Sequence, residues 1–264
     1  MRMDVISSVN REFIKNQLKK GKRLGERGMD DYRKIKIMVN PIGTAEGSAY
    51  VTLGNTKVLV GVKLGVDKPF PDTPDKGVLI TNAELRPIAS PTFELGPPNP
   101  ESIELARVVD RGLRESEMID LERLCMVPGE KVWIVFVDIH VLDYDGNLFD
   151  ASSFGAVAAL INARVPSYEG SEPYDLPTRG VPVSCTAVKI NGNVVLDPCS
   201  EEEKIADARL TVVMDENLAM RAMQKGLSGK FTIEEIRKTI DVMSRKSREL
   251  REIIKEGEKY EQKN

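Results

Sequence analysis

The segment from residue 131 to 142, K-V-W-I-V-F-V-D-I-H-V-L, is the strongest predicted β-strand in the chain. After Lys131, every residue in its first half is apolar, so apolar side chains point to both faces of any sheet it joins. Edge strands and half-exposed strands alternate instead. The segment therefore predicts a strand in the middle of a sheet.

Further strands are predicted on both sides of this segment, because apolar residues alternate with a period of two or form short runs between turns. In the first half of the chain these segments are 35–39, 49–53, 58–62 and 77–85, with a hairpin turn at Gly54-Asn55. In the second half they are 183–190, 194–197 and 208–214.

Helices are predicted at 8–20, 100–115 and 151–163 and in a long C-terminal segment, where Thr232 and Glu235 form a capping box. We expect one face of that last helix, an apolar stripe, to be buried. Residues 256–264 should be frayed and solvated. The stripe consists of Ile233, Ile236, Ile240, Met243, Leu250 and Ile254.

These elements predict an α+β fold with two lobes, each a mixed β-sheet packed with helices. Residues 1–168 would hold the N-terminal helix and the first lobe, and residues 181–258 the second lobe. The segment 169–180, inside a stretch rich in proline and glycine, is the predicted linker.

The overall charge limits the functions open to this chain. Its 264 residues carry a net charge of −3, with a pI near 5.5, so the surface as a whole does not attract polyanions. Any contact with nucleic acid must be local or assembled with a partner. The three cysteines show no C-x-x-C spacing, and no run reaches the roughly 18 apolar residues of a membrane span. We expect a cytoplasmic protein with no membrane contact.

The helix at 100–115 carries the strongest candidate site. Asn99 is a good N-cap and Pro100 a good first helical residue. At 100° per residue, three arginines share one face, opposite Leu105, Val108, Val109 and Leu113. Such a row suits phosphate groups, but nearby Glu104, Asp110 and Glu115 allow simple salt bridges instead. The three arginines are Arg107, Arg111 and Arg114.

Other chemistry is weakly supported. Neither a Walker loop nor a G-x-G-x-x-G motif is present, and His140 has no second histidine with which to form a zinc site. We expect His140 to be structural or on the surface and residues 143–147 to form a capped strand-to-helix turn. The carboxylates of 201–203 and Asp207 fit either a solvated acidic loop or a Mg²⁺ site. No cofactor, metal or catalytic residue is assigned.

Several segments together resemble the RNase PH family, and within it the non-catalytic RNase PH-like subunit of the archaeal exosome core. The resemblance extends from about residue 20 to 255 and implies an RNase PH-like fold (ribosomal protein S5 domain 2-like). The matching segments are 31–33, 45–49, 53–56, 69–74, 90–94, 96–98, 103–111, 141–143, 146–147 and Asp150.

The resemblance implies a hexameric ring of three heterodimers that degrades RNA from its 3′ end by phosphorolysis. Catalytic members carry a Gly-(Thr/Ser)-Arg signature at a helix start, which holds the phosphate. Here the same place has the sequence Gly146-Asn147-Leu148-Phe149, without the hydroxyl and the arginine. Catalytic members also carry paired acidic residues in the second lobe; by the resemblance Asp207 would match one of them, and its partner would be one of the glutamates at 201–203. The resemblance thus implies a subunit without chemistry of its own.

The resemblance also implies partners and a role for the arginines. The partners would be a catalytic RNase PH-like subunit, RNA-binding cap proteins and RNA. Arg107 and Arg111 would reach toward RNA at the interface with the catalytic subunit, whereas Arg114 either joins them or pairs with Asp110. Two alternatives remain: a stand-alone phosphate-dependent 3′–5′ exoribonuclease, or a purely architectural ring subunit.

Overall fold

The structure, a computed structural model that describes residues 8–259, places the long predicted strand inside a seven-stranded sheet. Strand β6 pairs antiparallel with β3 on one side and parallel with β4 on the other. The order is β13-β1-β2-β3-β6-β4, with β5 also paired to β6. Its strands are β1 (Ile35–Val39), β2 (Gly47–Leu53), β3 (Thr56–Asp67), β4 (Val78–Leu85), β5 (Cys125–Val127), β6 (Lys131–Asp143) and β13 (Glu258–Lys259).

The central position of β6 confirms the prediction, but its two faces differ. From Val135 to Val141 the odd-numbered residues are fully buried. The even-numbered residues on the other face, such as Phe136 and His140, are only half-buried. Within this chain, therefore, the first sheet is covered by helices on one face only.

The second sheet has four strands in the order β10-β9-β11-β12. Three of them match the predicted segments, but the edge strand β12 was not predicted. Its sequence M-R-A-M-Q-K-G has no β-branched or aromatic residue, so strand propensity gave no signal. The strands are β9 (Val183–Ile190), β10 (Asn193–Leu196), β11 (Ala208–Met214) and β12 (Met220–Gly226), and the small pair β7 (Arg164–Val165) and β8 (Tyr174–Asp175) stands apart.

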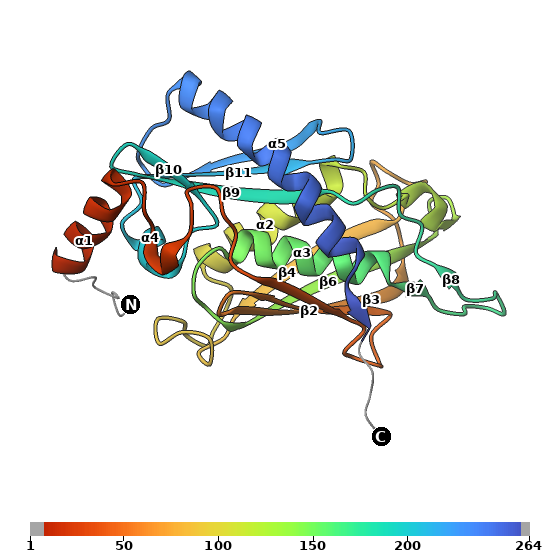
Figure 1. Cartoon of the computed structure of the whole chain (residues 1–264). Coiled ribbons are helices and arrows are strands. Elements are labelled where there is room, and N and C mark those ends of the chain that lie inside the picture. Colours follow the sequence, from red (N-terminus) through yellow and green to blue (C-terminus); the bar gives the residue numbers. More distant parts are fainter. Residues whose placement is uncertain (1–7, 260–264) are drawn as a thin grey trace.

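Helix α3 (Leu148–Ile161) runs between the two sheets (Figure 1). All its residues from Phe149 to Leu160 are buried, and its alanines, serines and glycine allow close packing, as predicted. At Gly155, a Cβ atom would lie 2.7 Å from a methyl carbon of Val60 on β3. One continuous core extends from the first sheet across α3 to the second sheet.

Helix α2 lies beside α3 and contacts β4 and β12, while helix α5 contacts α3, β1, β9 and β11. Helix α5 begins with the predicted capping box, in which Thr232 Oγ1 accepts from the Glu235 N–H at 3.1 Å. Met243, Leu250 and Ile254 are buried as predicted, whereas Ile233, the first residue of the helix, is 72% exposed. The helices other than α3 are α1 (Ser8–Lys19), α2 (Pro100–Glu115), α4 (Ser200–Lys204) and α5 (Ile233–Lys255). Short 3₁₀ turns lie at Leu24–Glu26 and Leu121–Leu124.

The two ends of the described chain pack in unexpected places. Helix α1 lies on the second sheet, where Ile14 and Leu18 form a small cluster with Val188 and Val195. The predicted division at 169–180 remains a prediction. The expectation of a frayed C-terminal end is wrong for Glu258–Lys259, which pair with β1, while residues 260–264 lie outside the described part. No helix within residues 8–259 has the length and apolar character needed to cross a membrane.

Candidate nucleic-acid interface and the turn before helix α3

Helix α2 presents the arginine row on its exposed face. Asn99 Oδ1 accepts from the Ser102 N–H at 2.8 Å, which confirms the predicted N-cap. Leu105, Val109 and Leu113 are buried on the opposite face, while Val108 is half-buried. Because the buried face fixes the rotation of the helix, the three arginines point outward, and all three are exposed.

Arg114 binds other groups of the same chain. Its guanidinium forms a two-point ion pair with Asp110, at 3.0 and 3.1 Å, and also donates to the Leu79 carbonyl at 3.0 Å. Asp110 in turn accepts from the Thr81 hydroxyl. Of the two roles left open for Arg114, the structure shows pairing with Asp110.

Arg107 and Arg111 have no carboxylate partner among the described residues. Arg111 donates only to the neutral side-chain oxygen of Gln224 on β12, at 3.3 Å. No hydrogen bond or ion pair involves Arg107 in residues 8–259. Glu104, which lies one turn before Arg107, pairs instead with Arg209 on β11 at 2.5 Å. The row thus holds two exposed positive charges that the acidic residues of α2 do not neutralise.

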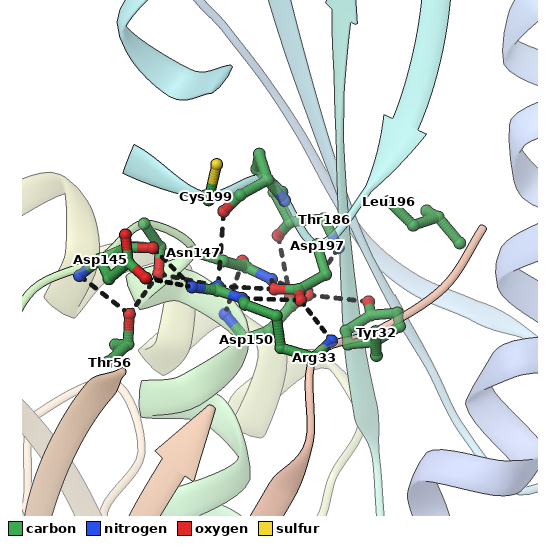
Figure 2. A network of polar contacts seen from close by, with 12 residues as sticks. Tyr32, Arg33, Thr56, Asp145, Asn147, Asp150, Thr186, Leu196, Asp197 and Cys199 are labelled. Carbon is green, nitrogen blue, oxygen red and sulfur yellow. Dashed lines mark hydrogen bonds and ion pairs between the residues drawn. The ribbon is translucent and has the colours of Figure 1, made fainter. Parts of the chain in front are cut away.

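The turn before α3 is the second part of the site, and it is closed by hydrogen bonds within the chain (Figure 2). Asn147 is fully buried in the left-handed region, with φ of 56°, and is the N-cap of α3. Its side-chain amide donates to Asp150 and to Asp197, each at 2.9 Å. This confirms the predicted capped strand-to-helix turn.

A carboxylate of the chain lies where such a turn would hold an anion. The backbone N–H of Asn147 donates to Glu203 Oε1 at 2.9 Å, and the Tyr144 hydroxyl donates to Glu203 Oε2 at 2.7 Å. Burial raises the pKa of Glu203, and the hydrogen bonds from Tyr144 and Asn147 counter only part of that effect. A helix N-terminus favours an anion, and here the anionic group is a side chain of the protein.

Gly146 allows this close packing. Its φ is +86°, and a Cβ atom there would lie 2.4 Å from the Cys199 carbonyl carbon and 2.5 Å from the Pro198 carbonyl oxygen. Only glycine fits both the backbone conformation and the space. The segment before α4 therefore covers the turn directly.

Arg33 joins the turn to the second sheet (Figure 2). Its guanidinium binds Asp197 at two points, Nε to Oδ2 at 2.9 Å and Nη2 to Oδ1 at 2.8 Å, and donates to the Asp145 carbonyl. Burial would raise the pKa of Asp197, but the hydrogen bonds and charge of Arg33 outweigh it, and the pKa is lowered. The Asp197 side chain is fully buried as an ion pair.

Asp150, in the first turn of α3, gathers donors from distant parts of the chain. The Tyr32 hydroxyl, the Ser184 hydroxyl and both the N–H and hydroxyl of Thr186 donate to it at 2.8 to 2.9 Å. Even so, complete burial raises its pKa to about 6, because desolvation outweighs these hydrogen bonds. These hydrogen bonds link α3 to β9 and to the segment before β1.

The remaining candidates have structural partners. Glu202 and Glu203 turn inward within α4, so the expectation of a solvated acidic loop is wrong for these two residues and holds for Glu201 and Asp207, which are exposed. Asp207 accepts from the Asn191 N–H at 2.7 Å. His140 lies 3.5 Å from Glu84 on the half-buried face of the first sheet. Residues 8–259 contain no group of three histidine, cysteine or acidic side chains placed to hold a metal ion.

Two models of one protein family match successive parts of the chain. The model described as 3′ exoribonuclease family, domain 1, matches residues 31–166, and domain 2 of the same family matches residues 180–246. The chain is 52% identical over 250 residues to exosome complex component Rrp42 of Thermoplasma acidophilum, covering 94% of this chain and 96% of that protein. It is 48% identical over 263 residues to Rrp42 of Pyrococcus furiosus, covering 95% and 94%.

Solved structures of archaeal exosomes also match nearly the whole chain. A chain in the Archaeoglobus fulgidus exosome with RNA bound to the active site matches with a TM-score of 0.90 and 49% identity, covering 92% of this chain and 97% of that one. A chain of an archaeal exosome core matches with a TM-score of 0.87 and 46% identity, over 94% and 97%. Rice (Oryza sativa) Rrp46, at 20% identity and a TM-score of 0.68 over 89% and 99%, shares the fold.

Proposed function

The chain belongs to the 3′ exoribonuclease (RNase PH) family, and from this we propose that it is the non-catalytic RNase PH-like subunit of an archaeal exosome core. In this role it alternates with a catalytic RNase PH-like subunit in a hexameric ring of three heterodimers. RNA-binding cap proteins complete the assembly, which degrades RNA from its 3′ end in the cytoplasm. Relatives with the name Rrp42 and 48–52% identity over nearly the whole chain support this role.

The closed turn at Gly146-Asn147 is the observation that carries the proposal. Phosphorolysis needs an attacking phosphate ion held by countercharge and by backbone N–H groups. Here no hydroxyl or arginine follows Gly146, and the Asn147 N–H is bound to Glu203 at 2.9 Å. A carboxylate at that point repels phosphate electrostatically. We infer that this subunit performs no phosphorolysis.

The two unneutralised arginines give the subunit a role in RNA binding. Arg107 and Arg111 lie one helical turn apart on the exposed face of α2, whose opposite face is buried. Guanidinium groups bind phosphate oxygens at two points, so this pair suits successive phosphates of a single strand without reading its bases. We assign RNA contact to Arg107 and Arg111, and give Arg114 the secondary role of holding Asp110.

A charge-reversal experiment tests the assignment. The subunit is mixed with a catalytic RNase PH-like partner, and RNA affinity and phosphorolysis are compared for wild type and for the Arg107→Glu/Arg111→Glu double variant. We expect weaker RNA binding and slower degradation with an intact ring, measured by its size in solution. Normal assembly with unchanged RNA affinity and unchanged phosphorolysis would leave only the architectural role.

A further inference from the structure

Arg209 occupies a fixed slot beside the arginine row. It lies on β11, and its guanidinium carbon is 4.1 Å from the centre of the Phe149 ring at the start of α3. On the other side is Gly226 of β12, where a Cβ atom would lie 2.6 Å from Nη2 and 2.9 Å from the guanidinium carbon. The Arg209 side chain is only 14% exposed. An aromatic ring and a glycine backbone therefore fix the direction of the guanidinium.

The slot directs Arg209 toward one carboxylate. Its Nη2 donates to Glu104 Oε1 at 2.5 Å, across from β11 to α2. Glu104 is three residues before Arg107, a spacing at which opposite charges on a helix attract each other. In this structure Glu104 forms its ion pair with Arg209 on β11 instead. Arg107 is left without a partner among the described residues.

Other acidic residues of α2 do not take its place. Asp110, also three residues from Arg107, is bound to Arg114 and to the Thr81 hydroxyl. The free charge of Arg107 thus depends on contacts that hold both nearby carboxylates elsewhere: Arg209 binds Glu104, and Arg114 together with the Thr81 hydroxyl binds Asp110. The Arg209 side chain, 14% exposed, is more buried than that of Arg114, which is 44% exposed.

We propose that Arg209 is a positioning residue for RNA binding, which acts by holding the Glu104 carboxylate away from Arg107. The proposal rests on the assignment of RNA contact to Arg107 in the proposed function. Without Arg209, Glu104 turns toward Arg107 and competes with RNA phosphates for its guanidinium. The Arg209–Glu104 pair itself adds no net charge, so its effect is on the availability of Arg107.

The test measures the affinity of a single-stranded RNA oligonucleotide for the complex of this subunit with its catalytic partner. Arg209→Met should weaken RNA binding about fivefold, because one exposed ion pair contributes about that much to the affinity. It should also flatten the dependence of log affinity on log salt by about 0.7, the value for one phosphate contact on a single strand. Arg164→Met removes a cation paired with Asp175 in the distant β7–β8 hairpin and is the control for net charge.

Two further variants separate positioning from packing. In Arg209→Met/Glu104→Gln the competing charge is gone, so RNA affinity should recover to within about twofold of wild type. Gly226→Ala keeps every charge but pushes the guanidinium out of its slot, since the added Cβ meets the flexible end of Arg209 rather than backbone. It should weaken RNA binding in the same direction as Arg209→Met, even if Arg209→Met itself fails to fold.

The outcomes distinguish this inference from the function on which it rests. If Arg107→Gln weakens RNA binding but Arg209→Met and Gly226→Ala do not, the positioning role is wrong and the RNA contact stands. A loss in Arg209→Met that Glu104→Gln fails to restore means that Arg209 acts through packing, which also overturns the inference. If Arg107→Gln has no effect on RNA affinity, both the contact and the positioning role are wrong.

Discussion

Arg23 and Glu202 form an ion pair that is completely shielded from solvent, although 179 residues separate them in the sequence. Arg23 Nε donates to Glu202 Oε1 at 2.9 Å and Nη2 donates to Oε2 at 2.7 Å. The guanidinium also donates to the carbonyls of Leu196 and Asp197. The pair joins the segment before β1 to α4, whose Glu203 occupies the turn at Asn147.

Removing one member of this pair should destabilise the protein strongly. Arg23→Met leaves the Glu202 carboxylate buried with only the more distant Arg27 guanidinium, 3.7 Å away, as a cation, so the cost should lie toward the lower end of about 3–5 kcal/mol. The free energy of unfolding from chemical denaturation measures this loss. The double variant Arg23→Met/Glu202→Met is the matched control, because an apolar pair of similar volume should recover most of the stability. Equal stability of Arg23→Met and wild type would contradict the burial of this pair.

Gly146→Ala and Gly192→Ala give a matched test of the covered turn. Both glycines have positive φ, +86° and +83°, but only Gly146 has chain atoms within 4 Å of the added Cβ. Gly192→Ala should cost about 1–2 kcal/mol for the backbone conformation alone. Gly146→Ala should cost about 3 kcal/mol or more, because packing against the Pro198–Cys199 backbone adds to that strain. Equal losses of unfolding free energy would mean that the turn is open.

The buried carboxyl of Asp150 should titrate near neutral pH. Its carboxyl carbon, followed by NMR, should show a midpoint near the pKa of about 6 rather than near the ordinary aspartate pKa of 3.8. The folded protein therefore binds this proton more tightly than the unfolded chain does. A midpoint below the ordinary aspartate pKa would show that the hydrogen bonds outweigh the burial.

The same pKa sets the sign of a stability effect. The contribution of Asp150 to folding is greatest below about pH 4 and falls as the pH rises through about 6. Asp197 and Glu202, with lowered pKa values, act in the opposite direction, so the comparison must isolate one group. The stability lost in Asp150→Asn should shrink as the pH rises from about 4 to about 7.

Arg111 and Arg114 should contribute unequally to RNA binding. Arg111→Gln removes a guanidinium with no carboxylate partner, and should weaken RNA binding by the complex about fivefold. Arg114→Gln removes one that is bound to Asp110 and to the Leu79 carbonyl, and its effect should stay below about twofold, because the Thr81 hydroxyl still donates to Asp110 and holds it away from Arg107. Equal losses would mean that Arg114 leaves Asp110 to contact RNA.

The elements that the sequence predicted well depend on local signals. Asn99 before Pro100 and Thr232 before Glu235 mark the starts of α2 and α5, since each cap needs only residues three positions apart. The run of apolar residues in β6 likewise fixed its central place in the sheet. The rotation of α2, and with it the exposed arginine row, followed from its apolar stripe.

What the sequence did not predict depends on long-range contacts. The inward turn of Glu202 and Glu203 depends on Arg23 and on the Asn147 N–H, which no local pattern connects to them. The pairing of Glu104 with Arg209 rather than with Arg107 likewise spans 105 residues. Strand β12 forms because β11 provides a partner edge, although its own residues have low strand propensity.

We propose that the turn before α3 is closed to phosphate, while Arg107 and Arg111 are open to RNA. The most direct test incubates the purified chain alone with single-stranded RNA, inorganic phosphate and Mg²⁺, and measures the release of nucleoside diphosphates. We predict none with this chain alone, and phosphate-dependent release once the catalytic partner is added. Phosphate-dependent shortening of the RNA by the pure chain alone would contradict the account.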